Sequence, residues 1–221
     1  MAQHRIGIVL HCPALLLQMT HTDAYKTIER PSEGDYRDRG SKFMSYLFPC
    51  ENEDQLKGFV NELRKQHPSS RHVCYGAILG IENGIERSSD DGEPNGTAGL
   101  PILNQLLSAE LKSVALLVVR YFGGTKLGKS GLINAYKESA KEAINNAKLV
   151  TRYVTTEIQF RFNYDATGVV MQAIENIEHA IINEQVYDQD CLITVSIPKS
   201  ELDKALHLFD HTNEVDVSQK D

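Results

Sequence analysis

The 221-residue sequence has little cysteine, and its four cysteines lie far apart, with no C-x-x-C pair. Zinc modules and small disulfide-rich domains both need several closely placed cysteines. The spacing of Cys12, Cys50, Cys74 and Cys191 therefore argues against both classes of protein. We expect buried or free thiols in a reducing compartment.

A membrane-spanning helix needs about 20 consecutive apolar residues, and the sequence has no apolar run of that length. An apolar stretch near the N-terminus is interrupted by His11-Cys12-Pro13, and no small-x-small cleavage site follows it. Met19 offers an alternative start, so residues 1–21 are expected to be a loose tail or an over-long gene start. From these absences we predict a cytoplasmic protein.

Basic side chains are scarce in the last third of the chain. Residues 151–221 carry 13 acidic and 5 basic side chains, whereas residues 23–150 carry 17 of each. Affinity for nucleic acid depends largely on Lys and Arg side chains that displace counterions from phosphates. Any contact with RNA is therefore expected mainly in the N-terminal part.

No motif recurs with a period of 20–50 residues, so this is not a repeat protein. Instead, two parts with different patterns meet near residues 145–148. Residues 151–218 alternate and break as β-α-β-β-α-β, which predicts a ferredoxin-like, split-βαβ domain. Residues 22–148 form the other predicted domain, with strands at 24–30, 41–50, 72–81 and 114–120 and helices at 52–67, 100–107 and 131–148. The predicted fold class is α+β with two domains.

The octet Gly123–Ser130 fits the phosphate-loop pattern G-x-x-x-x-G-K-[S/T]. In a true phosphate loop, Lys129 would contact the β/γ-phosphates and Ser130 would hold Mg²⁺, which gives a nucleotide-binding phosphotransferase or NTPase as the alternative function. Such domains also need a mostly parallel sheet and a second Mg²⁺ ligand at a strand end, and the sequence predicts neither. We expect a tight strand-to-helix connection, with Ser130 as the helix N-cap.

Three carboxylates, those of Asp90, Asp91 and Glu93, lie within four residues and could bind a divalent cation through oxygen ligands. Because the EF-hand spacing is missing, a solvated loop is the preferred interpretation. Pairing with Arg120 or Arg71 is one alternative, and a metal-dependent hydrolase is a weaker one. Neither a catalytic triad nor an H-E-x-x-H zinc motif can be defended from spacing. No metal and no cofactor are predicted.

Several segments in fixed order resemble the signature of the YigZ/IMPACT family: 41–43, 70–74, 90–99, 101–103 and 120–128. The resemblance implies an N-terminal domain like the second domain of a small-subunit ribosomal protein and domain IV of elongation factor G. It implies a C-terminal domain like domain V of that factor. Eukaryotic relatives regulate translation by competing for an activator of a stress kinase, and the bacterial branch is suspected of acting at the ribosome or on RNA. Family members commonly have small residues in place of Lys129-Ser130, which implies that the loop is not a phosphate loop.

We therefore predict a non-enzymatic cytoplasmic protein that modulates translation by binding the ribosome, RNA or a translation-associated protein. Its oligomeric state is left open. The predicted binding surface joins the 90–99 segment to the 120–128 segment. Its residues are Asp90, Asp91, Glu93, Gly96, Thr97, Arg120, Tyr121, Phe122, Gly123, Gly124, Lys126 and Gly128.

Overall fold

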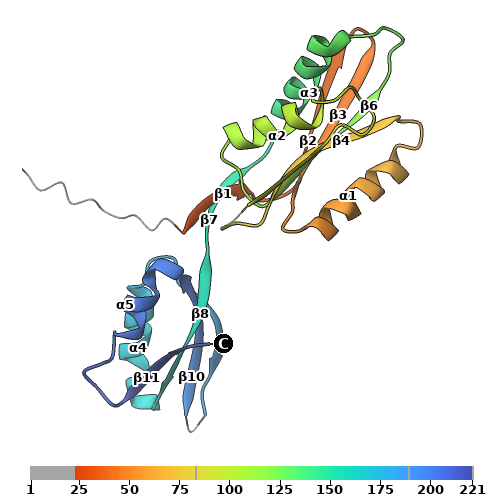
Figure 1. Ribbon diagram of the computed structural model, residues 1–221. Helices are drawn as coiled ribbons and strands as arrows, with labels where there is room; N and C mark the ends of the chain where they lie inside the picture. Colours follow the sequence, from red (N-terminus) through yellow and green to blue (C-terminus); the bar gives the residue numbers. More distant parts are fainter. Residues whose placement is uncertain (1–22, 83, 189, 221) are drawn as a thin grey trace, which may run out of the picture.

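The computed structural model describes residues 23–82, 84–188 and 190–220, which form two folded units (Figure 1). Among these residues, every pairing between named strands is antiparallel, and the helices lie against the faces of the two larger sheets. The structure confirms the predicted α+β class. The predicted tail, residues 1–21, lies outside the described residues.

The N-terminal unit is built on a five-stranded sheet with strand order β2-β3-β6-β4-β5. Sequence patterns predicted β3, β4 and β6 but missed the two edge strands, whose residues are mostly polar and exposed. The strands are β2 (Ser32–Asp38), β3 (Ser41–Pro49), β4 (His72–Leu79), β5 (Ile85–Ser89) and β6 (Val114–Tyr121).

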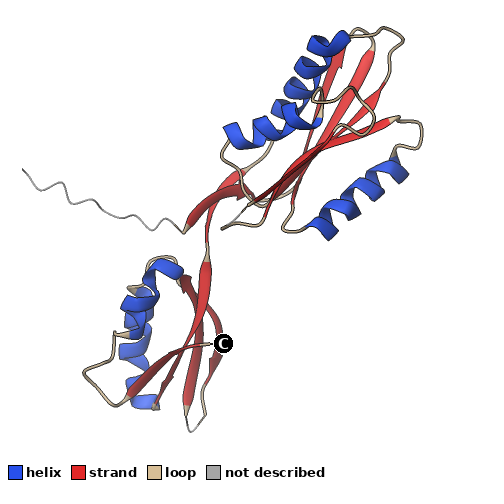
Figure 2. Cartoon of the chain, in the orientation of Figure 1, coloured by secondary structure: helices blue, strands red, loops and turns tan. Residues whose placement is uncertain are grey.

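Helices cover both faces of this sheet (Figures 1 and 2). Helix α1 (Glu53–Gln66) packs on one face, against β6 residues such as Leu117. Helices α2 (Gly99–Ser108) and α3 (Gly128–Asn145) pack on the other, against residues such as Leu116. Seven of the eight β6 residues are therefore buried, as expected for a strand that is covered on both sides.

The C-terminal unit is a four-stranded sheet of order β11-β8-β10-β9. Its elements follow the predicted β-α-β-β-α-β order, with a core between the helices and one sheet face. The limits of the two domains and their likeness to elongation factor G stay predictions. The elements are β8 (Thr155–Phe162), α4 (Thr167–Glu175), β9 (Ile181–Val186), β10 (Cys191–Pro198), α5 (Leu202–Leu206) and β11 (Val215–Gln219).

A two-stranded ribbon joins the units. Strand β1 (Ala24–Ile28) pairs with β7 (Leu149–Tyr153), and after Val154 the chain runs on as β8. The backbone carbonyl of Val154 accepts a hydrogen bond from the Lys199 N–H at 3.0 Å, so the junction is tied to the C-terminal unit.

The state of the cysteines and the apolar length of the helices can be read from the described residues. Cys50, Cys74 and Cys191 are buried and free, as expected, whereas Cys12 lies outside the described residues. Burial raises the pKa of the Cys50 thiol to about 11, so this thiol is protonated at neutral pH. In the described part of the chain, no helix is long and apolar enough to cross a membrane.

Candidate functional site

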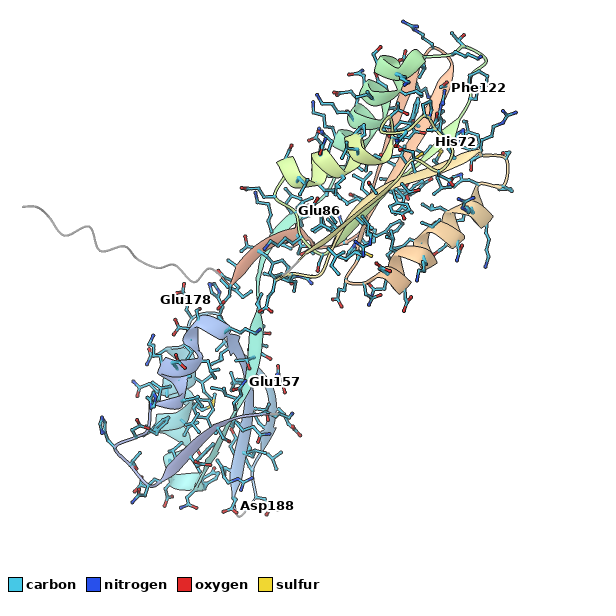
Figure 3. The ribbon with its side chains drawn as sticks, viewed as in Figure 1. His72, Glu86, Phe122, Glu157, Glu178 and Asp188 are labelled. Carbon is cyan, nitrogen blue, oxygen red and sulfur yellow. The ribbon has the colours of Figure 1, made fainter. Side chains whose placement is uncertain are left out.

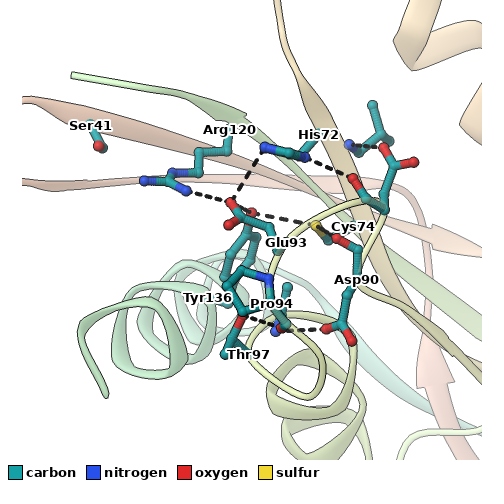
Figure 4. A network of polar contacts seen from close by, with 12 residues as sticks. Ser41, His72, Cys74, Asp90, Glu93, Pro94, Thr97, Arg120 and Tyr136 are labelled. Atoms are coloured by element: carbon teal, nitrogen blue, oxygen red, sulfur yellow. Dashed lines mark hydrogen bonds and ion pairs between the residues drawn. The ribbon is translucent and has the colours of Figure 1, made fainter. Parts of the chain in front are cut away.

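The acidic loop, residues 90–99, is organised around the Asp90 carboxylate (Figure 4). Oδ1 accepts hydrogen bonds from the N–H groups of Ala98 and Gly99, each at 2.9 Å, and Oδ2 accepts one from Gly96 at 2.8 Å. Burial opposes ionisation, but these N–H groups outweigh it and lower the pKa of the Asp90 carboxyl. Asp90 thus holds the loop in place and caps the start of α2.

We expect Asp90→Asn to lower the free energy of unfolding by about 2 kcal/mol at pH 7, because an amide N–H₂ would face the Gly96 N–H. Since the folded-state pKa of Asp90 is lowered, its contribution is complete above the usual aspartate pKa of about 3.9 and is lost as the pH falls through the folded value. Urea unfolding from pH 7 to pH 3 measures both effects. The exposed Asp216→Asn variant is the control, and equal stability of the two variants would contradict the prediction.

The next carboxylate clamps the loop to the sheet and to α1. Asp91 has a positive φ of 42°, and its Oδ2 accepts the Val73 N–H at 2.7 Å while Oδ1 pairs with Arg64. The Asp91 carbonyl is 2.7 Å from Nδ1 of His72. Because a carbonyl only accepts, Nδ1 carries the proton, and in the neutral ring Nε2 remains an acceptor.

The third carboxylate, Glu93, is buried, with a side chain that is 4% exposed. Its Oε1 accepts hydrogen bonds from Nη1 of Arg120 and from the Tyr136 hydroxyl, the latter at 2.9 Å (Figure 4). The solvated-loop interpretation is therefore wrong for Glu93, and the alternative of pairing with Arg120 is confirmed. The energetic reason is that a buried Arg120 needs an anion beside it.

The remaining predicted residues of the acidic loop shape its backbone. Gly96 has a φ of +75°, and Thr97 is buried and donates its hydroxyl hydrogen bond to the Pro94 carbonyl at 2.6 Å. The carboxylates of the loop face three different sets of donors. Within the described ranges, no group of three His, Cys, Asp or Glu side chains could hold a metal ion.

The glycine loop, residues 122–127, connects β6 to α3. Gly123 lies directly on the β2–β3 turn, where an added Cβ would sit 1.9 Å from the carbonyl carbon of Gly40. Gly124 and Gly128 have φ values of +88° and +73°. The prediction of Ser130 as N-cap is wrong, since the chain enters the helix at Gly128 with Leu127 as the cap.

The sheet around the phosphate-loop octet differs from that of a nucleotide-binding P-loop domain. Strand β6, which precedes the octet, lies between β3 and β4 and is antiparallel to both. P-loop domains place this loop at the end of a strand in a mostly parallel sheet. The octet is a strand-to-helix connection in a different fold.

A cleft of about 420 Å³ lies between the acidic loop and the glycine loop. We call it the basic cleft. Four basic side chains line it, together with one carboxylate, one imidazole and several apolar groups. They belong to Arg71, Arg120, Lys126 and Lys129; to Glu93 and His72; and to Pro94, Phe122, Leu127 and Leu132, with Gly128 completing the wall.

The charge in the basic cleft is not balanced. Glu93 is engaged by Arg120, and within the described residues Arg71, Lys126 and Lys129 form no ion pair. The buried Nε of Arg120 has no hydrogen-bond partner among those residues either. The cleft therefore offers cationic groups to an anion.

A second cleft, of about 320 Å³, lies beside α1 and shows the contrast. Its Arg87 pairs with Glu53 at 2.7 Å, and its Lys57 pairs with Asp54 at 3.4 Å. Its charges are thus matched within the protein. The basic cleft differs in having basic side chains without such partners among the described residues.

The structure brings together only part of the predicted surface. Glu93, Arg120, Phe122, Lys126 and Gly128 line the cleft, whereas the other predicted residues of the two segments are not among its lining residues.

Tyr121 lies elsewhere, because its hydroxyl is 2.8 Å from Nδ1 of His67, at the end of α1. The prediction missed Arg71 and His72 as cleft residues, although the 70–74 segment was a signal for them. Figure 3 shows His72 and Phe122 at the end of the N-terminal unit that lies away from the C-terminal unit.

Comparison with known proteins finds the same signature. Residues 39–144 match the Impact N-terminal domain. The chain is 37% identical over 147 residues to the IMPACT family member YvyE of Bacillus subtilis, covering 66% of this chain and 68% of YvyE. It is 30% identical over 164 residues to YigZ of Escherichia coli, covering 73% and 80%. A crystal structure of a hypothetical protein matches 90% of this chain and 98% of its own, with a TM-score of 0.63 and 25% identity.

Proposed function

The chain belongs to the IMPACT family, and on this premise we propose that it is a non-enzymatic cytoplasmic protein that modulates translation by binding RNA, including RNA of the ribosome. The role in translation is what the family resemblance implies. RNA as the direct partner is supported by one observation, the unbalanced positive charge of the basic cleft.

The charge argument favours RNA over an acidic protein surface. Arg71, Lys126 and Lys129 are exposed and lie around one opening, next to the N-terminus of α3. The helix end has no side-chain cap and no acidic residue in its first turn. Free helix N–H groups with nearby Lys and Arg suit phosphate oxygens. This combination supports the basic cleft as a phosphate contact.

We expect the double variant Lys126→Ala/Lys129→Ala to lose about tenfold or more in affinity for RNA at physiological salt, because each lysine contacts a phosphate. The slope of log K against log salt should fall by about one per phosphate contact removed. Filter binding at graded salt measures this slope, and co-sedimentation tests binding to ribosomes.

The matched control is Lys57→Ala/Lys65→Ala, which removes the same charge from exposed positions on α1, on the other side of the sheet. It should bind like the wild type. Two results would refute the proposal: no association of the wild type with RNA or ribosomes at low salt, or equal losses in the two double variants.

A further inference from the structure

Phe122 is an exposed aromatic side chain that lines the basic cleft. This residue is 49% exposed although it directly follows the buried strand β6. The Arg120 guanidinium contacts two rings, with its Cζ 5.6 Å from the centroid of Phe122 and 5.5 Å from that of the buried Phe43. Phe122 is therefore in contact with Arg120, and about half of the residue remains accessible where it lines the cleft.

The opposite wall is suited to a phosphate. Helix α3 begins at Gly128 with uncapped N–H groups, and Lys126 and Lys129 flank this start. Arg120 is only 7% exposed, and its buried Nε has no partner among the described residues. The side chain that carries this unpaired donor lines a cationic cleft, and this is a second observation that points to an anionic ligand.

The dimensions restrict that ligand. A cleft of about 420 Å³ is of the size that holds one small organic molecule. A base in a duplex is stacked between its neighbours, so its face cannot lie on Phe122. An unpaired base can be splayed out and stacked on an aromatic ring.

We propose that the basic cleft captures a single unpaired nucleotide of an RNA strand. Its phosphate lies at Lys126, Lys129 and the start of α3, and its base stacks on Phe122. The inference rests on the proposed binding of RNA and adds which state of the RNA is bound. The protein then selects loops, bulges and single-stranded ends over continuous duplex.

A double-mutant cycle, with one change in the protein and one in the RNA, tests the stacking of a base on Phe122. The probe is a short fluorescent single-stranded RNA, compared with the same strand carrying abasic sites, in an anisotropy titration. We expect Phe122→Leu to weaken binding of the intact strand by about tenfold, and the abasic strand to bind the wild type about tenfold more weakly. Because both changes remove the same stacking contact, the combination should weaken binding no more than either change alone.

Two controls keep the test specific. Phe122→Tyr retains a ring and should bind within about twofold of the wild type. Tyr164→Leu removes another exposed ring, in the C-terminal unit, and should leave affinity unchanged. Thermal melting of each variant checks that it is folded.

Several outcomes would overturn the inference while leaving RNA binding intact. These are full affinity of Phe122→Leu, full affinity of the wild type for the abasic strand, or equal affinity for the matching duplex. Competition by inorganic phosphate or a nucleoside monophosphate at the same concentration as the strand would instead identify a small phosphorylated ligand and also overturn it. Absence of any RNA binding by the wild type would remove the proposed function itself.

Discussion

Glu93→Gln is expected to lower the free energy of unfolding by about 3–5 kcal/mol. The change keeps the size of the side chain but removes the charge that balances Arg120, which is 7% exposed. The Tyr136 hydroxyl also loses its charged acceptor. A buried cation left without its anion is among the most destabilising changes in a folded protein.

Urea unfolding at pH 7 measures this effect, with Glu86→Gln on the exposed edge strand β5 as the control. The control is expected to change stability by less than about 0.5 kcal/mol. The double variant Glu93→Gln/Arg120→Met should lose less than the sum of the two single changes, since it removes both charges together. A Glu93→Gln midpoint equal to that of the wild type would show that the buried pair is not needed for folding.

Gly123→Ala is expected to destabilise the protein by about 3 kcal/mol or more. The new Cβ would lie 1.9 Å from the Gly40 carbonyl carbon and 2.2 Å from the Ser41 nitrogen, both of them backbone atoms. The glycine loop would have to move away from the β2–β3 turn. RNA affinity should fall as well, because this loop carries Phe122 and Lys126.

The matched control is Gly58→Ala, at an exposed position within α1 where an added Cβ meets no atom within 4 Å. This change is expected to stabilise the protein by about 0.5–1 kcal/mol, since alanine is the better helix former. Urea unfolding of both variants gives the comparison. The steric argument fails if the two alanine variants shift the midpoint in the same direction.

The sequence predicted those parts of the fold whose hydrophobic pattern is strong. Strand β6 reads as a continuous apolar run, and α1 carries Glu53 and Asp54 in its first turn. Strands β2 and β5 were not predicted because they lie at the edges of the sheet and bury little apolar area, so their sequences show no hydrophobic pattern. Their pairing partners, β3 and β4, define them as strands.

The sequence identified the two loops of the site, but it did not predict which side chains within them contact one another. Glu93 reaches Arg120 and Tyr136 across 27 and 43 residues, so no local pattern distinguishes it from Asp90 or Asp91. The cleft also needs His72 directly opposite Arg120, a register set by the pairing of β4 with β6. Strand register between segments so far apart in sequence is decided by tertiary packing.

The uneven distribution of charge is also expected to orient the molecule toward the proposed partner. The basic cleft lies at one end of the N-terminal unit, and the C-terminal unit, attached through a narrow two-stranded ribbon, belongs to the acidic last third of the chain (Figures 1 and 3). Near a phosphate-rich surface, the first end is attracted and the second is repelled. If RNA is bound as proposed, we expect the field to turn the protein before contact, so that it docks end-on with its C-terminal sheet pointing away from the RNA and exposed to other molecules.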